Sequence, residues 1–371
     1  MKDINIGKII YQKRKEKNMT QEELACYLNI TKAAISKWET SQSYPDITLL
    51  PTLASLFNIS IDDLVDYRPQ MDKEDIKKLY HHLAREFTTK PFDEVYQECL
   101  KIISKYYSCF ELLLQMIVLL LNHANLANDI NKLHQYLNSL CHHIIDECDD
   151  IYVCHQTKQI QAIILLALNQ PIDIIDNFPE MKQPLMFSDT IIANAYKLLG
   201  KDKEAAEIMQ IYQYQYVLTL IQNITSYIYY NNDHKTRRHE ATKRLLKLIE
   251  IYNLATLNPA TVLSIYLTLA TISISNNEPE NCLEYLKKYV ETACQIEFPI
   301  ILKGDDYFDM IDNWLEQLDL GPSAPRNDTM IIKSIQEAIT TNIFEPVKDN
   351  IEYHQLLNQL NQSLGAYNHE H

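Results

Sequence analysis

Residues 20–45, TQEELACYLNITKAAISKWETSQSYP, constrain this chain most, because they contain the capping signals of two short consecutive helices. Thr20 is a favoured N-cap residue, and Glu23 three positions later completes a capping box. The pair predicts a helix over residues 21–28. Asn29 then occupies the tight turn, where the backbone must be left-handed and asparagine tolerates this better than most residues with a Cβ.

A second cap, Thr31, predicts the next helix over residues 32–39. The spacing of apolar residues indicates which side of each helix faces a core. The inward set is Leu24, Ala25, Leu28, Ile30, Ile35 and Trp38. The outward set is Gln21, Lys32, Ala33, Ser36 and Lys37. Small and cationic side chains on an exposed helix are suited to the major groove of DNA, so the pattern predicts a DNA reader.

The same stretch resembles the helix-turn-helix regulators of the xenobiotic-response-element class, to which the lambda and 434 repressors also belong. The positions that match the family pattern are Gln21, Leu24, Ala25, Leu28, Ile30, Thr31, Ile35, Ser36, Trp38, Glu39 and Pro45. Asn29 and Ser41 depart from it, since the family usually has glycine at both turns. Both turns therefore depend on residues that tolerate the left-handed region less well than glycine.

The resemblance also implies roles for individual residues. In this family the first helix of the pair crosses the DNA backbone and the second lies in the major groove. Carried over by position, the residues near base edges are Lys32, Ala33 and Lys37. The phosphate contacts are Gln21, Ser36 and Thr40, and the cap Thr31 completes the expected DNA interface. Trp38 and Glu39 would instead brace the core of the domain.

The charge distribution agrees with a reader at this end of the chain. Residues 1–45 carry eight Lys or Arg and five Asp or Glu, a balance of +3, whereas the whole chain has a formal net charge of −15. Everything after residue 45 therefore sums to −18. Such an acidic body repels duplex DNA and membrane surfaces, so its function should lie elsewhere.

Composition excludes several other classes. The chain has only five glycines, no two of them closer than seventeen residues, so it has no phosphate-cradling loop or dinucleotide fingerprint. Eight cysteines without a CxxC pair indicate free thiols in a reducing compartment. The apolar run at 112–121 is too short to span a bilayer, and no secretory signal precedes the motif. We expect a cytoplasmic protein that is not an enzyme, with no catalytic residues and no cofactor.

The remaining sequence predicts an all-α fold. Helices at 46–57 and 61–65, the latter capped by Ser60 with Asp63, would close the N-terminal domain, and 67–72 would be a hinge. Apolar residues then recur at three- and four-residue spacings. The expected helix pairs are 72–87 with 92–107, 109–126 with 128–148, 150–168 with 171–178, 185–199 with 202–215, 216–231 with 236–252, and 259–276 with 278–295.

These pairs repeat every 35 to 45 residues or so, the period of an α-solenoid. Two of them resemble tetratricopeptide repeats, because small or turn-forming residues fall where the helices of such a repeat cross. These residues are Ala193, Gly200 and Ala205 in one pair and Ala270, Asn277 and Cys282 in the other. We expect domains at 1–66 (helix-turn-helix), 73–320 (a degenerate tetratricopeptide-like solenoid) and 321–371 (helices that cap the array or form a dimer seam).

A DNA reader fused to such an array resembles the peptide-sensing quorum regulators of Gram-positive bacteria. That resemblance implies a homodimer on a double-stranded DNA operator, and a short peptide in the concave groove of the repeats. Asparagine can clamp a peptide backbone because its carboxamide both donates and accepts. The implied peptide-binding residues are Thr190, Asn194, Lys197 and Thr271. The alternative is a regulator whose body is a scaffold for a protein partner and has no peptide ligand.

Two further clusters are ambiguous from sequence alone. Tyrosines gather at 212–216 and 227–230, where some rings should pack inward and others line a groove or partner surface. Cys141, Cys148 and Cys154 lie near histidines, but they lack the short spacing of a structural zinc site. Buried thiols are the simpler interpretation, and we expect no metal.

Overall fold

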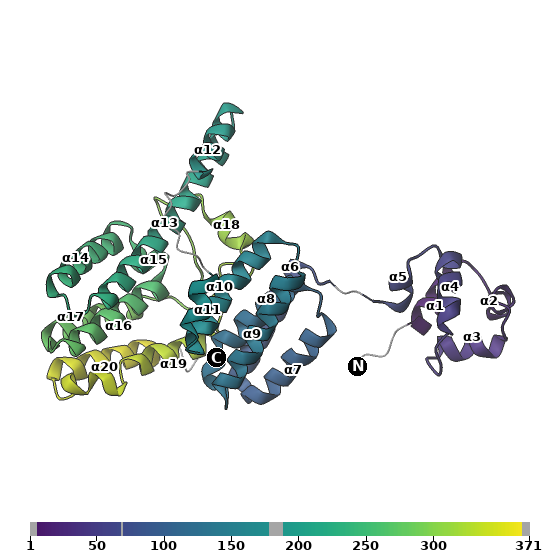
Figure 1. The fold of residues 1–371 in the computed structure, drawn as a ribbon, viewed down its shortest axis with the longest axis horizontal. Coiled ribbons are helices and arrows are strands. Elements are labelled where there is room, and N and C mark those ends of the chain that lie inside the picture. Colours follow the sequence, from purple (N-terminus) through teal and green to yellow (C-terminus); the bar gives the residue numbers. More distant parts are fainter. Residues whose placement is uncertain (1–5, 68–69, 178–187, 366–371) are drawn as a thin grey trace. The chain divides into compact units, whose positions relative to one another are not determined.

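The computed structural model describes residues 6–67, 70–177 and 188–365, and their regular structure is helical (Figure 1). Within those ranges no strand forms, and one isolated antiparallel bridge joins Ile301 to Ser323. The expected all-α class is confirmed. The chain divides into two compact units, residues 1–72 with 100–113 and residues 73–99 with 114–371. The finer domain boundaries stay predictions.

The N-terminal unit begins with five short helices and one 3-10 turn. They are α1 (Ile6–Glu16), α2 (Gln21–Tyr27), α3 (Lys32–Glu39), η1 (Ile47–Leu49), α4 (Leu50–Phe57) and α5 (Ile61–Val65). All of the expected inward residues are buried except Ile30, which is half-buried. With Ile6, Ile10, Leu53, Phe57 and Leu64 they form one apolar core. The predicted helix at 46–57 starts as the 3-10 turn, because Asp46 caps it by accepting from the Thr48 amide.

The body contains fifteen further helices in the described ranges, together with two 3-10 segments. They are α6 (Lys73–Thr89), α7 (Phe92–Lys105), α8 (Phe110–Asn122), η2 (Ala124–Leu126), α9 (Ile130–Glu147), α10 (Ile151–Ala167), α11 (Pro171–Asn177), α12 (Ser188–Leu198), α13 (Asp202–Tyr230), α14 (Lys235–Ile251), α15 (Leu254–Leu257), α16 (Pro259–Ser275), α17 (Pro279–Cys294), α18 (Asp312–Gln317), α19 (Asp328–Ala338), η3 (Asn342–Val347) and α20 (Ile351–Gly365). None of them is both long enough and apolar enough to cross a membrane.

Both helix pairs that resemble tetratricopeptide repeats form, although α13 runs beyond its expected end at residue 215. Helix α12 packs against α13. Helix α16 packs against α17 (Figure 1). Ala205, Ala270 and Cys282 are buried in these pairs, where a larger side chain would hold the helices apart. The intervening turns are left-handed, with φ of +72° at Gly200 and +57° at Asn277. The small residues and turn residues therefore do what their spacing predicted.

Two helix predictions were wrong. The predicted break at 215–216 does not exist, because α13 runs through it without interruption and no glycine, proline or capping side chain is present there to end the helix. The acidic stretch 305–312, whose aspartates predict the solvated face of a helix ending near residue 318, is followed only by the short helix α18. The Asp305 carboxylate instead accepts from the Tyr307 and Phe308 amides at 3.0 and 2.8 Å, which forms a turn. Residues 68–69 of the expected hinge and 178–187 lie outside the described residues.

The C-terminal helices belong to the same apolar core as the last repeat pair. Helix α20 packs against α17 and α19. The Tyr289 hydroxyl donates to the Ile335 carbonyl at 3.0 Å, and the Tyr353 hydroxyl donates to the Ile339 carbonyl at 2.7 Å. Because these hydroxyls and the surrounding core are buried, the C-terminal segment covers the last face of the array. The choice between a capping role and a dimer seam stays a prediction.

Candidate functional site

Helix α2 is fixed at its start by the predicted capping box. The Thr20 hydroxyl accepts from the Glu23 amide at 3.1 Å, and the Glu23 carboxylate accepts from the Thr20 amide at 2.7 Å. The Glu23 carboxylate accepts from both the amide and the hydroxyl of Thr20, and these two hydrogen bonds, the amide one first, hold the pKa of Glu23 below its ordinary value. A second box forms at Ser60 and Asp63. Both capping predictions are confirmed, and two backbone donors at each helix start are satisfied.

The turn between α2 and α3 has the predicted conformation. Asn29 adopts a left-handed φ of +55°, and the Ile30 amide then donates to the Ala25 carbonyl at 3.0 Å. Thr31 begins α3, and its hydroxyl oxygen accepts from the Ala34 amide at 3.3 Å. Ser41, at the end of α3, is also left-handed with φ +59°. The turn chemistry therefore sets where α3 begins relative to α2.

A buried ionic network joins the first three helices. Arg14 on α1 donates from Nε to Glu39 Oε1 at 2.5 Å and from Nη2 to Oε2 at 2.8 Å. Gln21 Nε2 donates to the same Oε2 at 2.8 Å, and Arg14 Nη1 donates to the Met19 carbonyl at 2.7 Å. Burial raises the pKa of Glu39, but the hydrogen bonds from Arg14 and Gln21 outweigh it, so the pKa lies below its ordinary value. Glu39 thus braces the domain as predicted.

The outward face of α3 carries the residues expected near base edges. Lys32, Ala33 and Lys37 are exposed, while Ser36 is half-buried. Lys32 Nζ lies 3.5 Å from Glu22 Oε2, an exposed pair that water and salt screen. Lys37 has no ion-pair partner among the residues that the structure describes. This leaves its ammonium available to a ligand.

Three polar residues of the expected DNA interface, Thr31, Thr40 and Gln21, differ in what they can donate to a phosphate. Thr31 accepts through its oxygen from the Ala34 amide, so its O–H proton remains free. The Thr40 hydroxyl already donates to the Ser36 carbonyl at 2.8 Å, so a phosphate would have to compete for that proton. Gln21 is half-buried, and its amide group already bonds Glu39. Thr31 is therefore the freest donor of the three.

The expected peptide-binding residues lie on two helices. Thr190, Asn194 and Lys197 are exposed along α12, and Lys197 Nζ lies 3.9 Å from Asp202 Oδ1. Thr271, on α16, is half-buried, and its hydroxyl donates to the Leu267 carbonyl at 2.9 Å. None of the four lines the groove described next. Their roles stay predictions.

A groove of about 840 Å³ lies between α13 and α14. Its lining residues are Leu220, Asn223, Ile224, Ser226, Tyr227, Tyr230, Thr236, Arg237, Glu240, Ala241 and Arg244. The predicted division within each tyrosine cluster is found only in the first, where Tyr214 is buried and Tyr216 is exposed. All three rings of the second cluster are exposed, and Tyr227 and Tyr230 line this groove. The sequence analysis did not identify Arg237 and Arg244 as groove residues. The available signal was α14 itself, which has six basic and two acidic residues within an acidic body.

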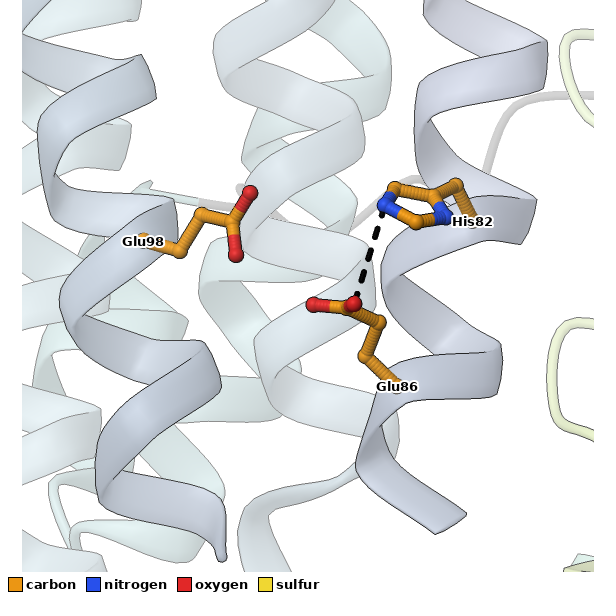
Figure 2. Close-up of side chains that lie close together, drawn as sticks. All are labelled: His82, Glu86 and Glu98. Carbon is orange, nitrogen blue, oxygen red and sulfur yellow. Dashed lines mark ion pairs between the residues drawn. The ribbon is translucent and has the colours of Figure 1, made fainter. Parts of the chain in front are cut away.

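A second cluster with no distinctive sequence signal lies between α6 and α7, where His82, Glu86 and Glu98 approach one another (Figure 2). Their potential ligand atoms all lie within 4.8 Å of one another. Lys90 Nζ, however, lies 2.7 Å from Glu86 Oε1 and already supplies a positive charge there. Its hydrogen bond is the main reason that the pKa of Glu86 is lowered. We therefore assign no metal to this cluster.

The cysteines near histidines are in surroundings that suit inert thiols. Burial raises the pKa of Cys141 to about 12, which disfavours the thiolate that binds metals. Cys154 Sγ lies 3.1 Å from the carbonyl oxygen of Cys148, and both residues are half-buried. These contacts give the sulfur atoms packing roles.

Comparison with known proteins adds a family for the first unit. The family model described as helix-turn-helix matches residues 10–64. The chain is 32% identical over 80 residues to the HTH-type transcriptional activator BcrR of Enterococcus faecalis, a match that covers 20% of this chain and 39% of that protein. The chain thus spans about two fifths of the length of that relative.

Solved structures were also matched over most of the chain. The apo form of the competence regulator ComR from Streptococcus vestibularis matches 85% of this chain and 98% of its own, at 14% identity and a TM-score of 0.28. A structure of PrgX matches 98% of this chain and 95% of its own, at 13% identity and a TM-score of 0.26. Scores this low show no more than a general likeness. The capped helices, the turn and the matched family model together identify residues 10–64 as a helix-turn-helix domain.

Proposed function

We propose that this protein is a sequence-specific DNA-binding transcription regulator in which α3 reads the major groove. The observation that carries the proposal is the outward face of α3, where exposed Lys32, Ala33 and Lys37 stand on a helix whose opposite side is buried. Lysine donates to guanine acceptors, and alanine leaves room for the helix to approach the bases. The Arg14–Glu39 network fixes the helix that presents them.

Phosphate contacts would position this helix without reading sequence. Thr31 has a free hydroxyl proton at the start of α3, where the backbone amides also favour an anion. Gln21, Ser36 and Thr40 complete the proposed set. Gln21 acts partly through Glu39, because its amide is already bonded to that carboxylate.

The body, residues 73–371, should hold two helix-turn-helix domains (the heads, residues 1–66) together and sense a signal. One recognition helix covers too few base pairs for a specific site, and helix-turn-helix proteins commonly bind as dimers. Residues 73–371 sum to −14, a net charge that repels duplex DNA. We assign it two roles, homodimerisation and binding of a short peptide that alters operator affinity. Exposed Asn194, with Thr190 and Lys197 on the same helix and Thr271 on α16, would bind the peptide backbone.

A second candidate function is a scaffold for a protein partner. It is favoured by large apolar side chains that are exposed on two consecutive helices, Ile172 and Ile175 on α11 and Ile191 and Leu198 on α12. Exposed apolar residues of this size are typical of protein contact surfaces. The same residues could equally serve the homodimer.

Selection of duplexes from a random pool by the full-length protein tests the proposed function. The pool should converge on one sequence, and a two-fold repeat with half-sites about one helical turn apart (~34 Å) would indicate two heads. A pool that stays random after repeated selection, while the protein still binds DNA, would reduce the head to a non-specific binder. No binding at all would contradict the DNA-binding function.

A further inference from the structure

The groove between α13 and α14 has one apolar wall and one cationic wall. The apolar wall is on α13, where Leu220, Ile224 and Tyr227 follow one another at four- and three-residue spacing. Tyr230 extends this wall and is 78% exposed. The volume of about 840 Å³ falls in the range that suits a few side chains of a small ligand. Apolar side chains of a ligand would cover rings and methyl groups that now face solvent.

The cationic wall is on α14. Arg237, Ala241 and Arg244 lie three to four residues apart, so they share one helix face with Glu240 between the two arginines. This face has a formal charge of +1, and α14 as a whole carries six basic and two acidic residues, whereas the whole chain has a formal net charge of −15. An anionic group is therefore attracted here, whereas most of the body repels it.

The arginines of α14 are not equally available. Arg238 points elsewhere: its Nη2 donates to Glu278 at 2.6 Å and its Nη1 to the Asn232 carbonyl at 2.5 Å. Arg237 Nη1 makes one long hydrogen bond of 3.3 Å, to Asn231 Oδ1. Within the described residues, the Arg244 side chain forms neither an ion pair nor a hydrogen bond. Its guanidinium is the best placed to accept a new partner.

We propose that this groove binds a short apolar peptide that carries a carboxylate, with Arg244 and Arg237 holding the carboxylate and the α13 wall covering apolar side chains. This inference rests on the proposed peptide-binding function, and it names a location and a ligand chemistry. A guanidinium fork matches the planar carboxylate with two parallel hydrogen bonds. Asn223 and Ser226, which stand beside the apolar residues of α13, supply donors and acceptors for the peptide backbone. The carboxylate belongs either to the C-terminus or to an Asp or Glu side chain.

Affinity capture from synthetic peptide pools tests this inference with the full-length protein. Three pools of apolar hexapeptides serve as probes. The first ends in a free carboxylate, the second is the same set as C-terminal amides, and the third is amidated but contains one Asp or Glu. Mass spectrometry of the captured peptides compares wild type with Arg244→Gln, Tyr230→Ser and a matched control, Lys247→Gln. Lys247 is an exposed cation of the same helix that does not line the groove.

Wild type should capture a carboxylate-bearing pool roughly tenfold or more over the neutral amides, the size expected for a charge-assisted hydrogen bond. Arg244→Gln should lose that preference, Tyr230→Ser should weaken capture of all pools alike, and Lys247→Gln should behave as wild type. Preference for the first or third pool identifies the source of the carboxylate. If wild type captures peptides but amides bind as well as acids, or Arg244→Gln keeps the preference, the inference is overturned and the peptide-binding function stands. If wild type captures nothing from any pool, both fail.

Discussion

Arg14 and Glu39 form a two-point ion pair across 25 residues of sequence, with Nε 2.5 Å from Oε1 and Nη2 2.8 Å from Oε2. Their side chains are 5% and 4% exposed. The pair fastens α1 to the last turn of α3, the helix proposed to read DNA. A buried pair of this kind is costly to break, because either partner alone is left as an uncompensated charge.

Arg14→Met should therefore destabilise the head by about 3–5 kcal/mol. Trp38 is a buried reporter in the head, and Trp314 is the only other tryptophan, so a Trp314→Phe background isolates its fluorescence. Urea unfolding of the full chain is the measurement. Lys13→Met is the matched control, since Lys13 forms a more exposed pair with Glu16 on the same helix and should cost under about 1 kcal/mol. Equal losses in the two variants would show that the Arg14 pair is no stronger than a surface pair.

The lowered pKa of Glu39 predicts a pH dependence of head stability. A carboxyl group whose pKa is lower in the folded state stabilises that state above its unfolded pKa and loses this contribution as pH falls through the folded pKa. The ordinary value is 4.5, so the loss should set in below about pH 4.5. Unfolding followed by Trp38 should show wild type losing more stability than Glu39→Gln between pH 5 and 3 or so. Parallel pH profiles for the two proteins would contradict this.

How much of the head could be predicted depended on whether the signal was local. The caps at Thr20, Thr31 and Ser60 act within three residues, so their hydrogen bonds could be inferred from spacing alone. The Arg14 partner could not, because it depends on how α1 packs on α3. The same holds for Gly7, where an added Cβ would lie 2.0 Å from the Trp38 carbonyl oxygen. Only the packed structure shows that a close helix approach requires glycine there.

The body was less predictable for a related reason. Helix periodicity located most helices, but it could not distinguish one long helix from two short ones, and α13 was divided incorrectly. The position of the groove was also missed, because Tyr227 and Arg244 line it from two different helices and no spacing within either helix encodes that arrangement. The small residues at Ala270 and Cys282 were recognised because their spacing lies within one repeat pair.

Asn194→Ala should weaken peptide binding by about 1–3 kcal/mol, because the peptide's amide groups lose their partner. Calorimetry with short apolar peptides, including any encoded beside the gene, measures this. Gln222→Ala is a suitable control, since Gln222 is an exposed carboxamide on the neighbouring α13. By linkage, a peptide that changes operator affinity must bind the operator complex with an affinity altered by the same factor. If Asn194→Ala binds as wild type does, the α12 face has no part in the site.

The full-length protein should be a homodimer at micromolar concentration without DNA. The reason is that two heads about one helical turn apart (~34 Å) need a body that holds them. Light scattering should give twice the chain mass of 43.4 kDa. Substituting Leu198, an exposed apolar residue of α12, with glutamate tests whether that surface contributes. A particle of 43.4 kDa for wild type would remove the dimer from the proposal.

The central claim is that α3 reads DNA sequence, and the ratio of two affinities tests it most directly. Fluorescence anisotropy gives the affinity of the full-length protein for the selected duplex and for a random duplex of equal length, at one fixed salt concentration. Lys37→Ala should weaken binding to the selected duplex by about 1–3 kcal/mol more than binding to random DNA, so the ratio falls. Lys8→Ala removes an exposed charge from α1 and should leave the ratio unchanged. A ratio that Lys37→Ala also leaves unchanged would contradict a reading role for α3.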